Sequence, residues 1–417
     1  MSVTAKQYHT SVEKSSAVLP TRPSFWNYSA LKEIETCPRR YSLSRASYPD
    51  LWGGQGYPQI PTLAALFGDV IHGALDVIVT AFVDAGCDSP QGTSAVAVLR
   101  KLGGYTAVTE RVIDDRLARL PTSPRLHADQ RQRMERNLRG RVAEARAQIQ
   151  AYVCRTTLIP SPSGSASDAT TSGGSGSGFA LPRRPAKPGA HAEVLLAAEE
   201  LRLMGRIDLL KIADDRVDIT DYKTGTEDPG HLDQLRLYAL LWNLDQIVNP
   251  SRRLVSELTA AYPNRNVTIP APSESALREL ESSLKQRTTS ADEEIQAPVP
   301  RAIPNDQNCS TCQVRQLCDV YWSQMAPDPL SLADGTWFDY QGMVGPQNGS
   351  RSWWLLHEKS GQKQLLLRTT ATTPPLSGGS RIRLLGIRLD DDPENNATAA
   401  IMTVSSEMFV LTAPGNS

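Results

Sequence analysis

Three strand-like segments that follow one another closely, at residues 192–198, 201–212 and 217–223, constrain the fold of this chain most. Each is rich in aliphatic residues, and short polar turns separate them, which is typical of neighbouring strands in one sheet. Segments with helical periodicity lie on both sides of the strands. These are residues 28–45, 65–86, 231–244 and 273–287. Strands between helices predict a mixed α/β fold in which helices flank the sheet.

Two stretches between the helix at 65–86 and the strands differ in composition from the rest. Residues 93–156 predict an Arg-rich helical insertion, which either contacts phosphates or forms a solvated helix surface. Its Arg residues are densest at positions 125, 131, 133, 136, 139, 141 and 146. Residues 161–190 predict a flexible loop, because 12 of the 18 residues from 161 to 178 are Gly or Ser.

The C-terminal part of the chain becomes rich in short strands separated by polar turns. Five such segments predict a small all-β barrel over residues 330–417, of the OB-fold kind, and a β-sandwich without a ligand is the alternative. Its aromatic side chains could stack on bases or fill the core, and we expect the core role for at least half of them. They are Trp337, Phe338, Tyr340, Trp353 and Trp354.

Composition sets wider limits on the function. The chain has 417 residues and a net charge of −1, so nucleic-acid binding requires a local basic surface. No apolar run approaches the ~20 residues that span a bilayer. The first twenty residues lack the apolar core of a signal peptide. We therefore expect a soluble, cytoplasmic protein that does not contact membranes.

The last strand-like segment ends in D-Y-K-T-G, with Asp221 and Lys223 two residues apart. Because strand side chains alternate between faces, these two project from the same face. Asp208, in the G-R-I-D of the preceding strand, can lie on the other side of a divalent cation. A lysine beside such a cation can orient a water molecule and offset charge that forms on a phosphorus atom. A surface ion pair without a function is the alternative.

Other polar residues at regular spacing are candidates for the same site. His72 lies on the helical face of Gly68 and Asp76, and is either a metal ligand or an ordinary core histidine. Gln234 and Tyr238, four residues apart on a helix, could hold a phosphate or the lysine, or hydrogen-bond on the helix surface. Glu193 is either a neighbour of the metal site or a surface acid.

The ordered series G-x3-H, G-R-I-D, D-Y-K-T-G and Q-x3-Y spans residues 68–238 and resembles the RecB-like branch of the PD-(D/E)XK nucleases. The resemblance implies a restriction-endonuclease-like sheet in a nuclease domain at 25–325, after a flexible N-terminus at 1–24. It implies hydrolysis of DNA, preferably single-stranded, with Mg²⁺ or Mn²⁺. It also implies the site residues: as metal ligands His72, Asp208, Asp221 and the Tyr222 carbonyl, as catalytic lysine Lys223, and as helpers Gln234 and Tyr238. The long stretch between His72 and the strands departs from the pattern and leaves the substrate path open.

Three of the six cysteines, Cys309, Cys312 and Cys318, are spaced C-x2-C-x5-C. Three thiolates so close together call for a fourth ligand, and Cys37 in E-T-C-P-R-R-Y is the candidate. A site closed from residues 37 and 309 would couple metal binding to folding. This pattern resembles the AddB-type iron–sulfur nucleases and their CRISPR-associated relatives, which implies a 4Fe–4S cluster. Zinc is the alternative occupant. Cys87 and Cys154 stand apart and are expected to be structural, buried residues.

Two functions follow from these patterns. The first is a metal-dependent DNA nuclease, an exonuclease on single strands, that carries the iron–sulfur cluster. The second is a DNA-binding or assembly subunit of a helicase–nuclease complex with little or no activity of its own. A zinc-stabilised structural protein is a third alternative. A helicase or other proteins of DNA repair or defence are the expected partners, whereas cleavage polarity, pathway and oligomeric state stay open.

Overall fold

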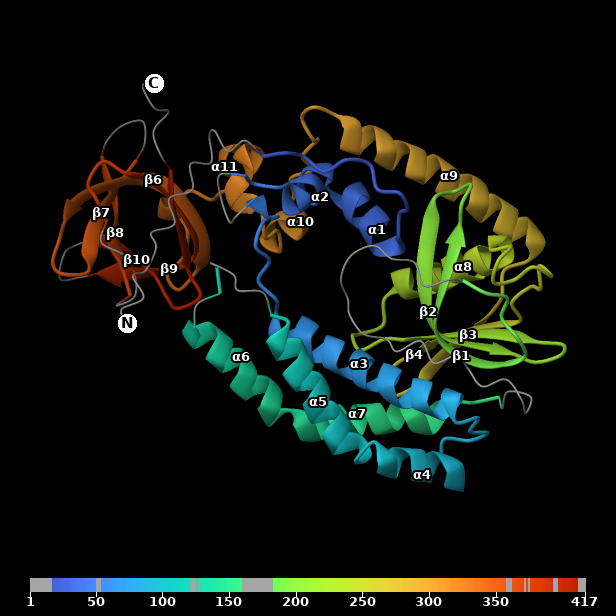
Figure 1. Cartoon of the computed structure of the whole chain (residues 1–417). Helices are drawn as coiled ribbons and strands as arrows, with labels where there is room; N and C mark the ends of the chain where they lie inside the picture. The colour runs from blue at the N-terminus through green and yellow to red at the C-terminus, as the bar shows by residue number, and fades with distance from the viewer. Residues whose placement is uncertain are drawn as a thin grey trace.

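The computed structural model describes residues 17–49, 54–120, 125–126, 128–159, 183–357, 362–370, 373, 376–392 and 397–411. The flexible segments predicted at 1–24 and 161–190 fall largely outside these residues. Figure 1 shows a sheet with helices on both of its faces at one end of the molecule and a β-barrel at the other. The predicted boundaries between domains stay predictions.

The sheet has five strands in the order β1-β2-β3-β4-β5. They are β1 (Gly189–Ala198), β2 (Leu203–Ile212), β3 (Val217–Tyr222), β4 (Glu257–Ala261) and β5 (Asn266–Pro270). The β3–β4 pair is parallel and the other three pairs are antiparallel, so the sheet is mixed, as predicted. A parallel pair requires a crossover, and the helix α8 (Pro229–Leu244) supplies it.

One face of the sheet is covered by α8, α9 (Glu274–Gln296) and α1 (Tyr28–Thr36), whose apolar side chains form one core with the strands. α8 begins where Asp228 caps the Gly230 amide and Pro229 takes the first helical position. Gly205 on β2 lets this helix approach closely, because a Cβ atom there would lie 2.8 Å from the Tyr238 ring. The helix is therefore held at a fixed height over the strands.

The opposite face is covered by a second helical layer, centred on α3 (Leu63–Asp84). Its other members are α4 (Thr93–Lys101), α5 (Gly104–Ala118), α6 (Ala128–Gly140) and α7 (Val142–Arg155), where helices were predicted. Among the described helices α3 alone is long and apolar enough to cross a membrane. Its apolar side chains pack into this core against α5, α7 and β1, so its apolar character is that of a core helix.

The segment at 28–45, predicted as one helical stretch, is two helices. α1 ends before Cys37, and α2 (Pro38–Arg45) begins at Pro38 because proline tolerates only the first turn of a helix. Hydrogen bonds from the Arg39 amide to the Arg301 carbonyl and from Asn308 Nδ2 to the Thr36 carbonyl join this corner to the C-terminal side of α9. The short elements there are α10 (Asp306–Ser310), η3 (Arg315–Leu317) and α11 (Asp319–Gln324).

The barrel begins after η4 (Pro329–Ser331). Its strands are β6 (Trp337–Gln347), β7 (Ser352–Leu356), β8 (Lys363–Arg368), β9 (Arg381–Asp392), β10 (Ala397–Ile401) and β11 (Glu407–Leu411). The first five close in the order β6-β7-β8-β10-β9, with β8–β10 parallel, and β11 pairs with β9 outside the ring. The predicted closed, OB-like barrel is confirmed, although its last predicted strand is two strands.

Three of the five barrel aromatics fill its core, as expected for at least half of them. Phe338, Tyr340 and Trp353 pack among its aliphatic residues. Trp337 is 56% exposed. Trp354 lies at the surface with the Lys363 ammonium 4.4 Å from its ring centre.

Buried ion pairs attach the barrel to the rest of the chain. Arg125 donates to both carboxylate oxygens of Glu407 on β11, at 2.6 and 2.8 Å, and to the Pro58 carbonyl. Arg315 contacts Asp339 on β6 at 2.5 Å, and Tyr321 donates to the same carboxylate at 2.7 Å. Such pairs are costly to break on one side, because the remaining charge would stay buried.

Candidate active site

The two predicted acids lie on neighbouring strands at one end of the sheet. Asp208 is on β2 and Asp221 on β3, each one residue beyond Leu209 and Thr220, the pair that ends the β2–β3 ladder. Asp208 Oδ2 accepts a hydrogen bond of 2.6 Å from the Tyr222 amide, and the Lys223 amide donates to the Ala261 carbonyl at 2.8 Å. The backbone at residues 221–223 is therefore fixed from both neighbouring strands.

Lys223 is the centre of a chain of side-chain contacts. Its ammonium group lies 2.5 Å from Asp221 Oδ2 and donates to Gln234 Oε1 at 2.7 Å. Gln234 Nε2 in turn donates to the Tyr238 hydroxyl at 2.6 Å. The structure thus brings together the lysine, the acid and both α8 residues that the sequence singled out. The Tyr152 hydroxyl, from α7, donates to the Lys223 carbonyl at 2.6 Å, a contact that the sequence did not indicate.

His72 reaches the same site from the opposite helical layer. α3 approaches the end of β3 so closely that a Cβ atom on Gly68 would lie 2.8 Å from Thr224 Oγ1. Burial lowers the pKa of His72, and the charges of Asp221 and Lys223 also act on it. A neutral imidazole is the form that binds a metal ion.

Glu193 belongs to the acidic cluster and not to an isolated stretch of surface. It lies on β1 between Ala192, which pairs with Leu209, and Val194, which pairs with Ile207, so it stands opposite Asp208. Its φ of 53° is in the left-handed region, which is uncommon for a residue other than glycine. Burial, followed by the charge of Asp76, raises the pKa of Glu193 to about 7. The sequence showed Asp76 on the His72 face but gave it no role.

Burial dominates the electrostatics of the two central acids. It raises the pKa of Asp208 to about 7, with Glu193 as the next cause. It raises the pKa of Asp221 to about 6, with Asp208 as the next cause and Lys223 opposing it. Buried carboxylates that repel one another in this way are typical of functional sites.

A family model described as the PD-(D/E)XK nuclease superfamily matches residues 26–319. The chain belongs to the PD-(D/E)XK nuclease superfamily. The matched residues include the sheet, both helical layers and the cluster of acids around Asp208 and Asp221. No curated protein matches the chain.

Three solved structures show lesser similarity. The OB domain of MM0293 from Methanosarcina mazei is 17% identical, with 20% of this chain and 80% of that chain covered and a TM-score of 0.17. The structure of SSO0001 is 18% identical, with 31% and 59% covered and a TM-score of 0.20. A murine DNA-binding protein bound to double-stranded DNA is 11% identical, with 54% and 95% covered and a TM-score of 0.18. TM-scores this low carry no argument.

Members of the PD-(D/E)XK nuclease superfamily use divalent cations such as Mg²⁺ or Mn²⁺, and the site has features that fit one. Asp221 Oδ2 is buried and lies 2.5 Å from the Lys223 ammonium, which compensates its charge. Asp208 lies beside this pair, and two ionised carboxylates against one ammonium group leave a negative charge that suits a further cation. Within the described part of the chain, no three His, Cys, Asp or Glu side chains are arranged to hold an ion without adjustment.

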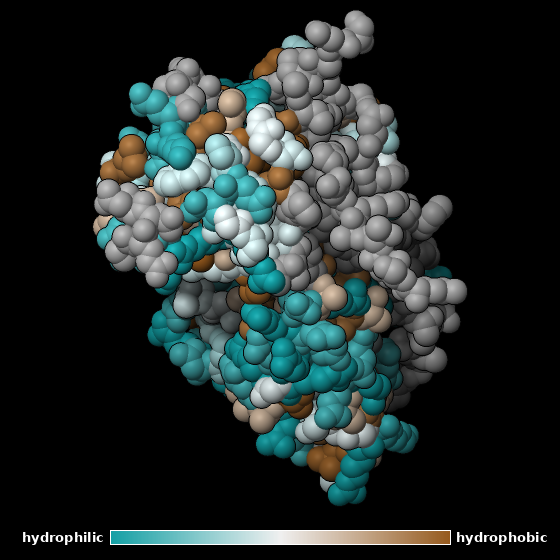
Figure 2. Space-filling view, turned by 90° about the vertical axis from the view of Figure 1, so that its left-hand side faces the viewer, coloured by the Kyte–Doolittle hydropathy of each residue, from teal (hydrophilic) through white to brown (hydrophobic). Residues whose placement is uncertain are grey.

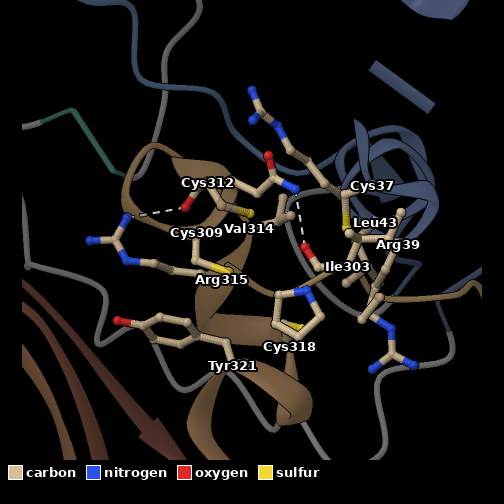
Figure 3. Close-up of a pocket in the computed structure, with 14 residues that line it drawn as sticks. Cys37, Arg39, Leu43, Ile303, Cys309, Cys312, Val314, Arg315, Cys318 and Tyr321 are labelled. Atoms are coloured by element: carbon tan, nitrogen blue, oxygen red, sulfur yellow. Dashed lines mark hydrogen bonds between the residues drawn. The ribbon is translucent and has the colours of Figure 1, made fainter. Parts of the chain in front are cut away.

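The four predicted cysteine ligands line one pocket of the molecule. Figure 3 shows Cys37 entering it from the start of α2 and Cys309, Cys312 and Cys318 from the segment after α9. Burial, with smaller contributions from the charges of Cys37 and Cys318, raises the pKa of the Cys312 thiol to about 11. All four are free thiols. Four converging sulfur atoms suit a tetrahedral metal ion or a cluster, although the side chains are not arranged around an ion.

The Arg-rich helices contribute less free positive charge than their sequence indicates. Arg125 is buried against Glu407, Arg139 pairs with Asp114 and Glu135, and Arg141 pairs with Glu144. Figure 2 shows the side of the molecule that lies to the left in Figure 1, and in its lower part the described residues are largely hydrophilic. Three arginines of the series are exposed and form no ion pair with the described residues. They are Arg133, Arg136 and Arg146.

Proposed function

We propose that the chain is a metal-dependent DNA nuclease of the RecB-like branch, an exonuclease that prefers single-stranded DNA in the cytoplasm and carries a 4Fe–4S cluster on its four clustered cysteines. The observation that carries the proposal is the position of Lys223. Its ammonium group touches the buried carboxylate of Asp221 and is held by Gln234, beside the half-buried Asp208 on the next strand. A lysine held in this way is suited to stabilise charge on a phosphate.

Each residue of the site has a separate task in this proposal. Asp208, Asp221, His72 and the Tyr222 carbonyl would hold Mg²⁺ or Mn²⁺, which supplies Lewis-acid stabilisation of a phosphoryl oxygen. The Lys223 ammonium orients the attacking water by a hydrogen bond and offsets the charge that forms on phosphorus. Gln234 keeps Lys223 in place, and Tyr238 accepts the hydrogen bond that fixes the Gln234 amide.

The test is cleavage of single-stranded DNA labelled at either end, and of a circular substrate, with Mg²⁺ or Mn²⁺. We expect short products from the linear strands, none after EDTA treatment, and a loss of at least about 100-fold in Lys223→Met, as for removal of one transition-state contact. The matched control is Lys101→Met, at the exposed end of α4. Full activity of Lys223→Met would contradict the proposal.

The same assay separates the alternative function. A DNA-binding or assembly subunit of a helicase–nuclease complex would retard labelled DNA without shortening it, in the presence of either cation. The folded barrel supports this alternative, because it adds a second surface, beside the nuclease fold, on which a partner could bind. Helicases or other repair and defence proteins would be its partners.

A further inference from the structure

His231, in the first turn of α8, makes a contact that no sequence motif indicated. Its Nδ1 atom lies 2.9 Å from the Tyr262 hydroxyl. The two ring centres are 5.8 Å apart. Tyr262 directly follows β4 and is buried, whereas His231 is half-buried.

The pair lies beside the active-site lysine. Tyr222 pairs with Ala261 in the parallel β3–β4 ladder, so the next residues along, Lys223 and Tyr262, are neighbours on one face of the sheet. On α8, His231 and Gln234 are three residues apart and share one helical face. One turn of helix, about 5 Å, therefore separates His231 from the residue that holds Lys223.

α8 thus makes three successive contacts across the sheet. Tyr238 lies over Gly205 of β2, Gln234 bonds to Lys223 beyond β3, and His231 bonds to Tyr262 beyond β4. The first two belong to the nuclease site already described. The third contact, between His231 and Tyr262, lies at the N-terminal end of α8, where His231 is half-buried.

The contact with Tyr262 bears on which nitrogen of His231 carries the proton. The Tyr262 hydroxyl lies 2.9 Å from Nδ1, where it can donate its own proton. With Nδ1 as acceptor, the neutral ring carries its proton on Nε2. Nε2 makes no hydrogen bond with the described residues. It is an N–H donor, held in a fixed direction, next to the site of phosphate chemistry.

The charges around His231 favour an anionic partner. Lys223 and Lys32 are the ammonium groups whose charges act on it, and Asp228 and Asp221 are the carboxylates. Asp228 is committed to the Gly230 amide as the cap of α8, and Asp221 and Lys223 pair with each other. The exposed Lys32 ammonium, which lies beside Gly230, forms no ion pair with the described residues.

We infer that His231 is a substrate-binding residue, whose Nε2–H donates to the phosphate next to the scissile one, and that Tyr262 is a positioning residue that sets the ring. This inference rests on the proposed nuclease function. In this inference the first turn of α8 binds the DNA strand, and Lys223 acts on the scissile phosphate.

The test combines a substitution in the protein with a substitution in the DNA and compares their separate and joint effects on DNA affinity. Binding is measured with Ca²⁺ in place of Mg²⁺ to prevent cleavage. We expect His231→Ala to raise the Kd for single-stranded DNA about tenfold, as for loss of one hydrogen bond to a charged group. A methylphosphonate at one internal phosphate should weaken binding by the wild-type protein. In His231→Ala the same substitution should cost clearly less, whereas methylphosphonates at other positions should cost both proteins the same.

The matched control is His191→Ala on β1, whose Nε2 already bonds to the Lys187 carbonyl and which should bind DNA normally. Tyr262→Phe removes one hydroxyl and should show part of the His231→Ala effect, which keeps the test valid if His231→Ala fails to fold. Equal losses at every methylphosphonate position would overturn the inference while the nuclease proposal stands. A wild-type protein that neither binds nor cuts DNA would overturn both.

Discussion

At the scale of single residues, the paired carboxylates make the site depend on pH. The pKa of Asp208 is raised to about 7 and that of Asp221 to about 6, from unfolded values near ~4. Between these limits the folded protein binds more protons than the unfolded chain, so stability falls as the pH rises. Above pH ~7 both carboxylates are ionised, and the full free-energy cost of burying their charges lowers the stability of the folded protein. A divalent cation binds the ionised carboxylates and offsets this cost.

We therefore expect Mg²⁺ to raise the melting temperature more at pH 8 than at pH 5.5, because protons compete with the cation at the lower pH. Thermal unfolding of chelator-treated protein, with and without Mg²⁺, measures this. Asp221→Asn should lose most of the Mg²⁺ effect. Asp218→Asn should retain it, because Asp218 on the same strand is engaged by Arg216 and Lys211. Equal Mg²⁺ shifts at both pH values would exclude these carboxylates as ligands.

At the scale of elements, the distance between α8 and the sheet sets the geometry of Lys223. Tyr238 rests against Gly205, and through Gln234 it is connected to the lysine. A side chain at residue 205 would lift the helix and lengthen this chain of contacts.

Gly205→Ala should consequently reduce the free energy of unfolding by about 1–3 kcal/mol, the usual cost of overpacking a core. It should also lower the nuclease activity, although residue 205 touches no substrate in our proposal. Gly140→Ala is the control, because a Cβ atom there has nothing within 4 Å. Urea unfolding measures the stability, and a Gly205→Ala protein as stable as the control would show that α8 can move freely.

The sequence revealed the elements whose pattern is local and missed those that depend on distant pairing. β1, β2 and β3 are aliphatic runs separated by short polar turns, and they were predicted. β4 and β5 were missed, because β4 is a five-residue run with two alanines whose parallel partner lies across a helix. For the same reason Asp221 and Lys223 could be found, as neighbours on one strand, but Tyr262 could not. Its place beside Lys223 exists only once β3 and β4 pair.

At the scale of the whole molecule, the cysteine pocket joins α2 to the segment that precedes the barrel. Cys37 and Cys309 are 272 positions apart in the chain yet line one pocket. Filling that pocket with a cluster would close a loop around the entire nuclease fold and remove many unfolded conformations.

We expect purified wild-type protein to be brown and to contain iron and sulfide, and Cys37→Ser to lose colour and melt at a lower temperature. Visible absorption, metal analysis and thermal unfolding measure these properties. Cys87 is buried as expected, but the expectation was wrong for Cys154, which lies exposed near the end of α7. Cys154→Ser is therefore the matched control, because its thiol is outside the pocket. A colourless wild-type protein that contains zinc would exclude the iron–sulfur cluster and leave the nuclease site unaffected.

Arg315 stands between Cys312 and Cys318 and donates both to the Cys312 carbonyl and to Asp339 of the barrel. The short peptide that presents the thiols is thus also the anchor of the C-terminal module. Oxidation of the sulfur atoms would therefore also affect the barrel. If the peptide that carries the thiols loosened, the barrel would lose its attachment to the rest of the chain, and nucleic-acid binding that involves both parts would weaken.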